Sequence, residues 1–587
     1  MPTVAFVLAL AGPAVAAGDP ILSLDQVHAG MSCTALSVVK GTTVARFGAT
    51  VEDIVRPEPP ATTSRILVRT SGTAVDGTGV GQGFSGSPIE CRGADGVERI
   101  IGAISEGVGQ YGGDLVLATP IEAILGQPVD PPPAARSAPR LLRAARALRS
   151  PLSVGGVSAG VAAAVTRRAQ RAGTLVLAAP SAPQVPFAAP AIVPGASIAV
   201  GLASGDVTAG AVGTVSYVDG DRVWAFGHPL DAAGRRSLLL QDAYVYAVVN
   251  NPIGTPEAST YKLAAPGHDL GTLTADGLSA VAGRLGPLPP RIPMRVFARD
   301  LDTGAFQRVD VELADETDVG DPSGASALSA VAPLAVAQGA TAVLDGAPTR
   351  QSASMCARFE LRERPKEPLR FCNTYVGAGG FDGVSGVGLV GDITEATALI
   401  DGYDASPLHV TDVEVNAKLQ RGLRQAFLSD LSGPRVLQRG RTVRLTLRLH
   451  RPRGTAFSRT LSMRVPRDAP RGPHELRLRG TPADAAGGAA LGSLVEALVG
   501  DTLGSSGEDT SGPDSLDELT KGVKAIERYD GVTASFRPRG SSDSGSDSGG
   551  ESGSDSSAAD SREGERKVLR DPKLRISGTA TLDVTVR

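Results

Sequence analysis

The stretch with the clearest chemical potential is Gly83-Phe84-Ser85-Gly86-Ser87-Pro88. Glycines on both sides of Ser85 allow tight or left-handed backbone turns that residues with a Cβ resist. Such a turn can direct the Ser85 hydroxyl into a cleft while nearby amide N–H groups converge on one point. Acyl transfer needs this geometry, because the substrate carbonyl oxygen becomes negative in the transition state. Ser85 is therefore a candidate nucleophile, with the amides of Gly83 and Ser85 as its oxyanion hole. The alternative is a Gly/Ser-rich β-turn without chemistry.

A serine hydroxyl becomes a good nucleophile only beside a general base. The chain has six histidines, and five stand in contexts without a catalytic signal; His268, for example, is expected in a loop with no strand to orient it. His228 differs, because it directly follows a predicted hairpin of residues 212–218 and 222–226. The turn between these strands, Asp219-Gly220-Asp221, is typical of a tight hairpin. His228 is the candidate base, and the alternative is a histidine that caps a turn.

Together the two motifs resemble the SpoIVB family of chymotrypsin-like serine peptidases, named for a sporulation signalling protease. The family's Gly-Met-Ser-Gly-Ser-Pro loop corresponds to residues 83–88, and its Leu-Gly-His-Gly segment to Phe226-Gly227-His228-Pro229. Gly213-Thr214-Val215 is similar to the family's hairpin before the histidine. The resemblance covers residues 28–125 and 195–250. It implies a serine endopeptidase without metal or organic cofactor that cleaves another exported protein, or the chain itself, with narrow specificity.

The order of the motifs departs from that family, because here the serine precedes the histidine along the chain. Triads are defined by geometry rather than by chain order, so this order is compatible with a shared site. Asp76 matches an acid in the family's loop and is the candidate third member, whereas Thr70 or Ser71 stands where the family's catalytic acid is expected. Rival acids near His228 are Asp219, Asp221, Asp231 and Asp242.

The elements that must position these residues are predicted to be short strands. A chain of 587 residues is too long for one core, and 72 Gly and 42 Pro favour many strands and turns. We expect a mainly β protein with two chymotrypsin-like β-barrel units, a C-terminal β-sandwich-like region and a disordered acidic segment. The expected boundaries are a serine-bearing half at 28–125, a linker with short helices at 126–194, a histidine-bearing half at 195–320, an accessory β-rich region at 325–500, a mostly disordered segment at 501–575 and a terminal strand at 576–587.

Residues 1–18 are apolar and end in small residues, which predicts a signal peptide. No other run approaches the roughly 18 apolar residues of a membrane span. We therefore expect an exported protein in the periplasm, the cell envelope or the medium. Export permits disulfides: Cys356 and Cys372 flank a predicted hairpin, which leaves Cys33 to pair with Cys91. Free buried thiols are the alternative, and no cysteine spacing indicates a metal site.

The formal net charge of -4 gives no reason to expect a nucleic-acid partner. Two predicted strands, 442–449 and 460–465, carry arginines on one face, which is either solvated or binds an anionic polymer. Two other functions compete with a peptidase. One is a catalytically silent envelope binding or scaffold protein that reuses the peptidase fold. The other is a polysaccharide-binding surface protein, which the 4% aromatic content disfavours because sugars usually stack on aromatic rings.

Overall fold

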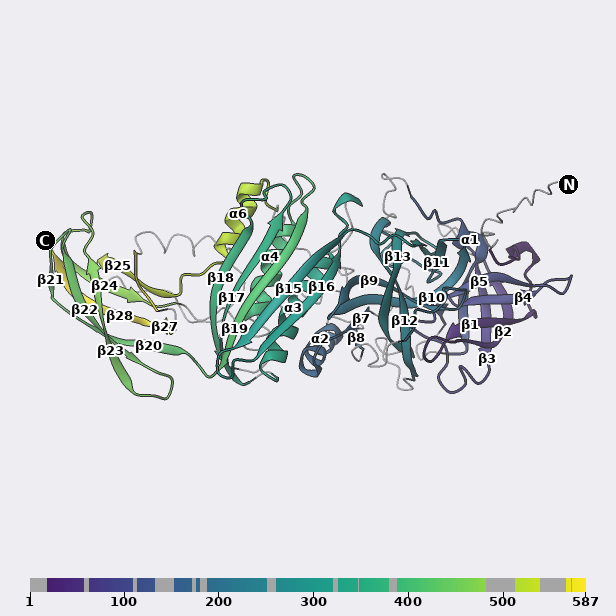
Figure 1. Ribbon diagram of the computed structural model, residues 1–587, viewed down its shortest axis with the longest axis horizontal. Helices are drawn as coiled ribbons and strands as arrows, with labels where there is room; N and C mark the ends of the chain where they lie inside the picture. Colours follow the sequence, from purple (N-terminus) through teal and green to yellow (C-terminus); the bar gives the residue numbers. More distant parts are fainter. Residues whose placement is uncertain are drawn as a thin grey trace, which may run out of the picture.

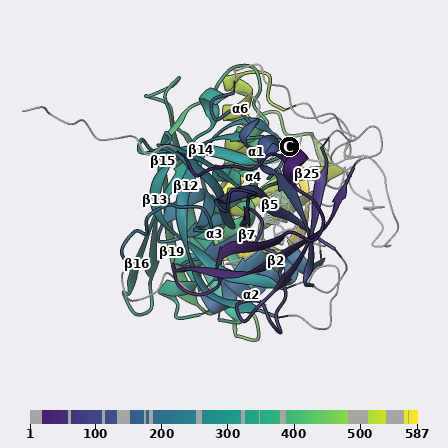
Figure 2. The same ribbon diagram turned by 90° about the vertical axis from the view of Figure 1, so that its right-hand side faces the viewer.

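The computed structural model describes residues 18–56, 63–108, 113–131, 152–171, 176–179, 187–250, 260–319, 326–346, 348–378, 388–481, 512–538, 566–571 and 573–587. The predicted signal peptide, apart from Gly18, and the acidic low-complexity stretch lie outside these residues. The molecule is elongated, with the N-terminal β unit at one end and the C-terminal sheets at the other (Figure 1). Viewed from the N-terminal end, the units lie behind one another (Figure 2).

The N-terminal unit is a closed six-stranded barrel in the order β1-β2-β3-β6-β5-β4. Buried and less buried residues alternate along β3, so one face of this strand fills the barrel. A disulfide joins Cys33 of β1 to Cys91 of β4, which face each other in the antiparallel register. The elements of this unit are η1 (Leu24–Gln26), β1 (Ser32–Val38), β2 (Val44–Val55), β3 (Arg65–Ser71), β4 (Pro88–Arg92), β5 (Glu98–Gly107), β6 (Leu115–Pro120) and α1 (Ile121–Leu125).

The next unit contains a ring of six antiparallel strands, β9-β12-β13-β14-β11-β10, which the pairing of β10 with β9 closes. The predicted hairpin is present as β10 and β11. Part of the predicted linker instead extends this sheet: β7 pairs with β10, and β8 pairs with β7. The elements are β7 (Leu152–Gly155), α2 (Ala159–Arg171), β8 (Val176–Ala178), β9 (Ser197–Gly205), β10 (Thr208–Asp219), β11 (Arg222–Ala225), β12 (Gly234–Val249), β13 (Tyr261–Asp276) and β14 (Val281–Leu285).

The central unit continues the same sheet through β16, which pairs with β9. Its strands run in the order β18-β17-β19-β15-β16, and the helices α3 and α4 pack on each other. Helix α3 is almost wholly buried, as its run of alanine, valine and leucine requires. A disulfide joins Cys356 to Cys372 across the hairpin β17–β18. The elements are β15 (Arg291–Asp300), β16 (Phe306–Ala314), η3 (Thr317–Val319), α3 (Ala327–Val343), β17 (Arg350–Leu361), β18 (Leu369–Ala378), α4 (Val390–Asp401) and β19 (Val410–Arg421).

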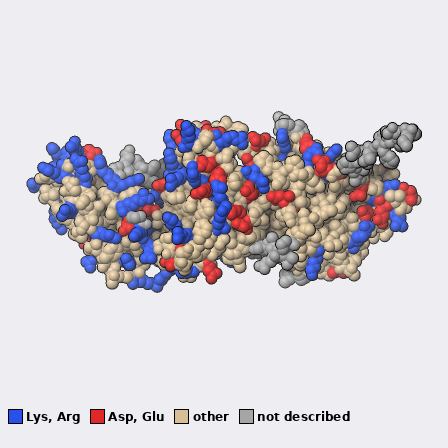
Figure 3. All heavy atoms as spheres, in the orientation of Figure 1, with Lys and Arg blue, Asp and Glu red and all other residues tan. Residues whose placement is uncertain are grey.

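The C-terminal unit has two sheets, β23-β22-β20-β27 and β21-β28-β24-β25-β26, that share one apolar core. Within the segment predicted as mostly disordered, α6, β25 and β26 are ordered elements, because their apolar residues join buried cores. Lysine and arginine gather on this end of the molecule (Figure 3). The elements are β20 (Gln425–Ser432), β21 (Val436–Leu437), β22 (Thr442–His450), β23 (Ala456–Arg464), β24 (Gly472–Arg479), α6 (Leu516–Ala525), β25 (Gly531–Pro538), β26 (Arg566–Arg570), β27 (Arg575–Ser577) and β28 (Thr579–Val586).

The structure is thus mainly β, with a closed barrel next to a second ring of strands. Among the described residues, no helix combines the length and the apolar character that crossing a bilayer would require.

Candidate active site

The serine loop, residues 81–88, lies between β3 and β4 and contacts the second ring of strands. Gly83 and Gly86 have φ values of +87° and +92°, so Ser85 lies between two left-handed glycines. A Cβ added to Gly86 would lie 1.9 Å from the Thr214 carbonyl oxygen and 2.5 Å from the Phe226 nitrogen. Glycine at this position therefore allows the serine loop to approach the β10–β11 hairpin at backbone distance.

Thr214 of β10 holds the backbone of the serine loop in place. Its Oγ1 donates to the Gly83 carbonyl at 3.0 Å, and its backbone N–H donates to the Ser85 carbonyl at 2.8 Å. The amides of Phe84, Gly86 and Ser87 donate to backbone carbonyls, whereas those of Gly83 and Ser85 have no hydrogen-bond partner among the described residues. Within residues 83–88, the two amides predicted as an oxyanion hole are therefore the ones without a partner among the described residues.

A buried lysine also supports the serine loop. Lys262 Nζ donates to Ser37 Oγ at 2.7 Å and to Thr214 Oγ1 at 3.0 Å, and it lies 4.6 Å from the Phe84 ring centroid. Ser37 Oγ in turn lies 2.8 Å from Ser87 Oγ. Burial lowers the pKa of Lys262 to about 7. Sequence reasoning missed this residue, and its only signal was a lysine directly before the apolar run Leu263-Ala264-Ala265.

His228 lies directly beyond β11, where Phe226 and Gly227 both have positive φ and turn the chain. Its side chain is 2% exposed, and its Nδ1 lies 2.6 Å from the Pro229 carbonyl oxygen. Because a carbonyl only accepts, Nδ1 carries the proton and Nε2 keeps its lone pair. The pKa of His228 is lowered to about 4, mainly by burial; the bond to Pro229 opposes this shift and the charge of Arg65 adds to it. His228 is therefore neutral at pH 7 in the tautomer that a general base needs.

Both candidate residues lie where the two β units meet. The Gly86 amide donates to the Ile104 carbonyl of β5, and a Cβ on Gly227 would lie 3.1 Å from the same oxygen. Ser85, at 1% exposure, and His228 are closed to solvent. Neither Ser85 Oγ nor His228 Nε2 has a hydrogen-bond partner among the described residues, so they do not bond to each other. An unpaired buried polar atom costs about 1–3 kcal/mol, and two such atoms at one junction require an explanation.

The candidate acid Asp76 does not reach this junction. Its side chain is exposed, and its Oδ1 accepts from the Gly72 amide at 3.0 Å within the same turn. Among the described residues it makes no hydrogen bond to His228. The rival Asp242 instead accepts two hydrogen bonds from His268, at 2.8 Å each. His268 lies on strand β13 and not in the expected loop, because the sheet continues through Pro266-Gly267.

A buried carboxylate that sequence reasoning missed holds the loop that follows His228 in the chain. Asp276, at the end of β13, accepts backbone N–H bonds from Leu230 at 2.7 Å, Asp231 at 2.7 Å and Ala233 at 3.2 Å. Next to it, Arg236 makes two 2.9 Å bonds to Glu316. Burial raises the pKa of Asp276, whereas Arg236 and the backbone bonds oppose the rise. Burial and the neighbouring Asp276 raise the pKa of Asp231 to about 6.

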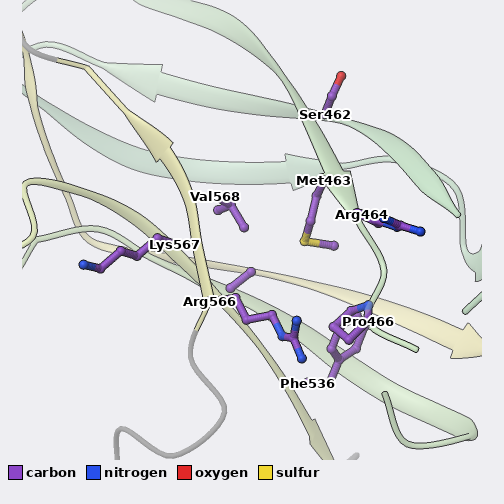
Figure 4. A pocket seen from close by; sticks show the side chains of 9 residues that line it. Ser462, Met463, Arg464, Pro466, Phe536, Arg566, Lys567 and Val568 are labelled. Carbon is purple, nitrogen blue, oxygen red and sulfur yellow. The ribbon is translucent and has the colours of Figure 1, made fainter. Parts of the chain in front are cut away.

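A cavity of about 210 Å³ lies elsewhere, between β23 and the β25–β26 edge of the C-terminal sandwich. Apolar side chains, among them Met463 and Phe536, line it together with Arg464, Arg566 and Lys567 (Figure 4). Within the described ranges, no group of three or more metal-ligating side chains occurs. Comparison of the chain with protein-family models, curated proteins and solved structures found no match.

Proposed function

We propose that the protein is an exported serine endopeptidase of SpoIVB type, with Ser85 as nucleophile and His228 as general base. The observation that carries this proposal is the coincidence of four unused groups at one junction. These are Ser85 Oγ, His228 Nε2 and the amides of Gly83 and Ser85, none of which has a partner among the described residues. A serine on one six-stranded unit and a histidine on the next is also the arrangement that a chymotrypsin-like site requires.

In the proposed reaction, His228 Nε2 removes the Ser85 proton while Oγ attacks the scissile carbonyl carbon. The negative oxygen that forms is bound by the Gly83 and Ser85 amides, and the loss of one such donor typically costs about 10²- to 10³-fold in rate. The resulting imidazolium protonates the leaving amine, and water then hydrolyses the acyl-enzyme. Because both side chains are buried, the junction must open for a peptide to enter.

This burial supports a narrow choice of substrate. A site closed in the resting protein selects against bulk digestion and favours a partner that opens it, or a segment of the chain itself. The proposed substrate is therefore one exported protein or this chain.

The experiment is labelling of the purified protein with a fluorophosphonate probe, alongside Ser85→Ala and His228→Ala. Labelling of the wild type that both substitutions abolish is the expected result. Ser216→Ala is the matched control, because Ser216 Oγ is also buried without a partner among the described residues but lies on strand β10. This control should label like the wild type.

The competing function is a catalytically silent binding or scaffold protein of the envelope. The closure of Ser85 and His228 from solvent, and the lack of a hydrogen bond between them, favour it. A folded wild type that remains unlabelled, including in the presence of envelope extract, would contradict the peptidase proposal and support this one.

A further inference from the structure

One peptide group, between Pro229 and Leu230, is hydrogen-bonded on both of its sides. Its carbonyl oxygen accepts from His228 Nδ1 at 2.6 Å, and its N–H donates to Asp276 Oδ1 at 2.7 Å. The imidazole, the peptide group and the carboxylate thus form a continuous chain of two hydrogen bonds. Each bond polarises the next in a buried environment. A carboxylate that attracts the peptide N–H makes the carbonyl a stronger acceptor for the Nδ1 proton.

Asp276 is held rigidly in this position. It is paired with Gly234 of β12 and Val281 of β14, so its backbone belongs to the closed ring of strands. Its second oxygen accepts from the amides of Asp231 and Ala233, which fixes the loop that carries the Pro229 carbonyl. The side chain is 1% exposed; this burial raises its pKa, whereas Arg236 and the three backbone N–H bonds that it accepts favour the carboxylate form.

The other charged groups near this chain have partners of their own. Arg236 pairs with Glu316 at 2.9 Å and with Asp231 at 3.4 Å, and its charge also favours the carboxylate form of Asp276. Arg65, which faces His228, bonds to Glu106 at 3.0 Å. Asp276 is the carboxylate that accepts from the peptide group beside His228.

We infer that Asp276 is the third member of the proposed Ser85–His228 pair, and that it acts on His228 through the Pro229–Leu230 peptide group instead of touching the ring. This inference rests on the proposed function. As a positioning residue, Asp276 keeps the proton on Nδ1 and leaves Nε2 free to accept from Ser85. Its negative charge also stabilises the imidazolium that forms when the serine proton is transferred. The acid that the sequence placed at Asp76 is thus supplied from β13.

The test is Asp276→Asn in the full chain, because the amide preserves shape while it removes the charge and one acceptor. Asp242→Asn is the matched control, since Asp242 is an equally buried carboxylate that holds His268 instead of His228. Direct removal of a triad acid's charge costs about 10⁴-fold in rate. Through a peptide group we expect a smaller loss of about 10- to 100-fold in the fluorophosphonate labelling rate, and no loss in the control.

A second readout separates positioning from mere folding. Histidine NMR should show His228 of the wild type protonated on Nδ1, and Asp276→Asn should lower the pKa of His228 because an attractive negative charge is lost. Trp224, the single tryptophan of the chain, lies on β11 and reports whether the variant is folded.

The two proposals fail in different ways. A wild type that does not label would contradict the peptidase function. A wild type that labels, together with an Asp276→Asn variant that labels equally fast with an unchanged His228 pKa, would overturn the role of Asp276 alone. A His228 ring protonated on Nε2 in the wild type would overturn it even if the variant did not fold.

Discussion

Replacement of Lys262 by methionine should make the protein more stable at neutral pH and less stable at alkaline pH. Lys262 is fully buried beneath the serine loop, and its ammonium group contacts two hydroxyls and an aromatic ring rather than a carboxylate. Methionine has a similar length and volume, so it should fill the same space without leaving a large cavity. What changes is the cost of burying a charge.

The magnitude follows from the pKa of Lys262, which burial lowers from 10.5 to about 7. A difference of about 3.5 units corresponds to about 4–5 kcal/mol, at 1.36 kcal/mol per unit. Methionine loses the two hydrogen bonds to Ser37 and Thr214, at about 1 kcal/mol each. The variant should therefore be more stable than the wild type by about 2 kcal/mol at pH 7.

The sign of this difference depends on pH. Between pH 7 and 10.5 the unfolded chain keeps the Lys262 proton that the folded chain has released, so the stability of the wild type rises with pH. The Lys262→Met variant lacks this rise in stability with pH. At pH 10 the burial penalty has nearly vanished, and the variant should be less stable than the wild type by about 1 kcal/mol.

The assay is urea unfolding followed by the fluorescence of Trp224, which is buried in the same ring of strands as Lys262. Lys418→Met is the control, because Lys418 is exposed on β19 and its replacement should give a pH-independent change. A difference between Lys262→Met and the wild type that stays constant from pH 7 to 10 would refute the reasoning. The lysine would then not titrate between these values in the folded protein.

Three further predictions concern the same junction. Burial lowers the pKa of His228 from 6.5 to about 4. The free energy of unfolding therefore includes about 3 kcal/mol that is fully present above pH 6.5, where the ring is neutral in both states, and that is lost as the pH falls through 4. In the Trp224 unfolding assay, the stability of His228→Asn should fall less steeply than that of the wild type between pH 6.5 and 4. An unchanged dependence of stability on pH would contradict this prediction. Gly86→Ala should destabilise the protein by at least about 3 kcal/mol and abolish labelling, because its Cβ would meet backbone atoms, whereas Gly96→Ala, which has open space around it, should label normally. Removal of the Cys33–Cys91 disulfide, which spans 58 residues, should cost about 4 kcal/mol in thermal unfolding, and an unaltered melting temperature would count against it.

The features that could be predicted from the sequence depend on local chemistry. Gly83 and Gly86 predict the left-handed turn around Ser85, because only glycine adopts this backbone without strain. The Asp219-Gly220-Asp221 turn predicts the hairpin that ends at His228. Alternating apolar residues predict the strands, and strand composition predicts a mainly β fold. These signals lie within a few residues of the feature they describe.

The charged groups that complete the candidate site could not be predicted in this way. Asp276 is 48 positions from His228 in the sequence, and Lys262 is 177 positions from Ser85. The resemblance to the family's loop favoured Asp76, but that residue lies on an exposed turn. An aspartate or lysine is solvated on most surfaces, and it becomes a functional group only where strand pairing buries it against a particular backbone. The sequence therefore specified the turns that carry Ser85 and His228. The closure of the second ring of strands decided which charges surround them, because burial and hydrogen bonding arise only once distant strands have packed.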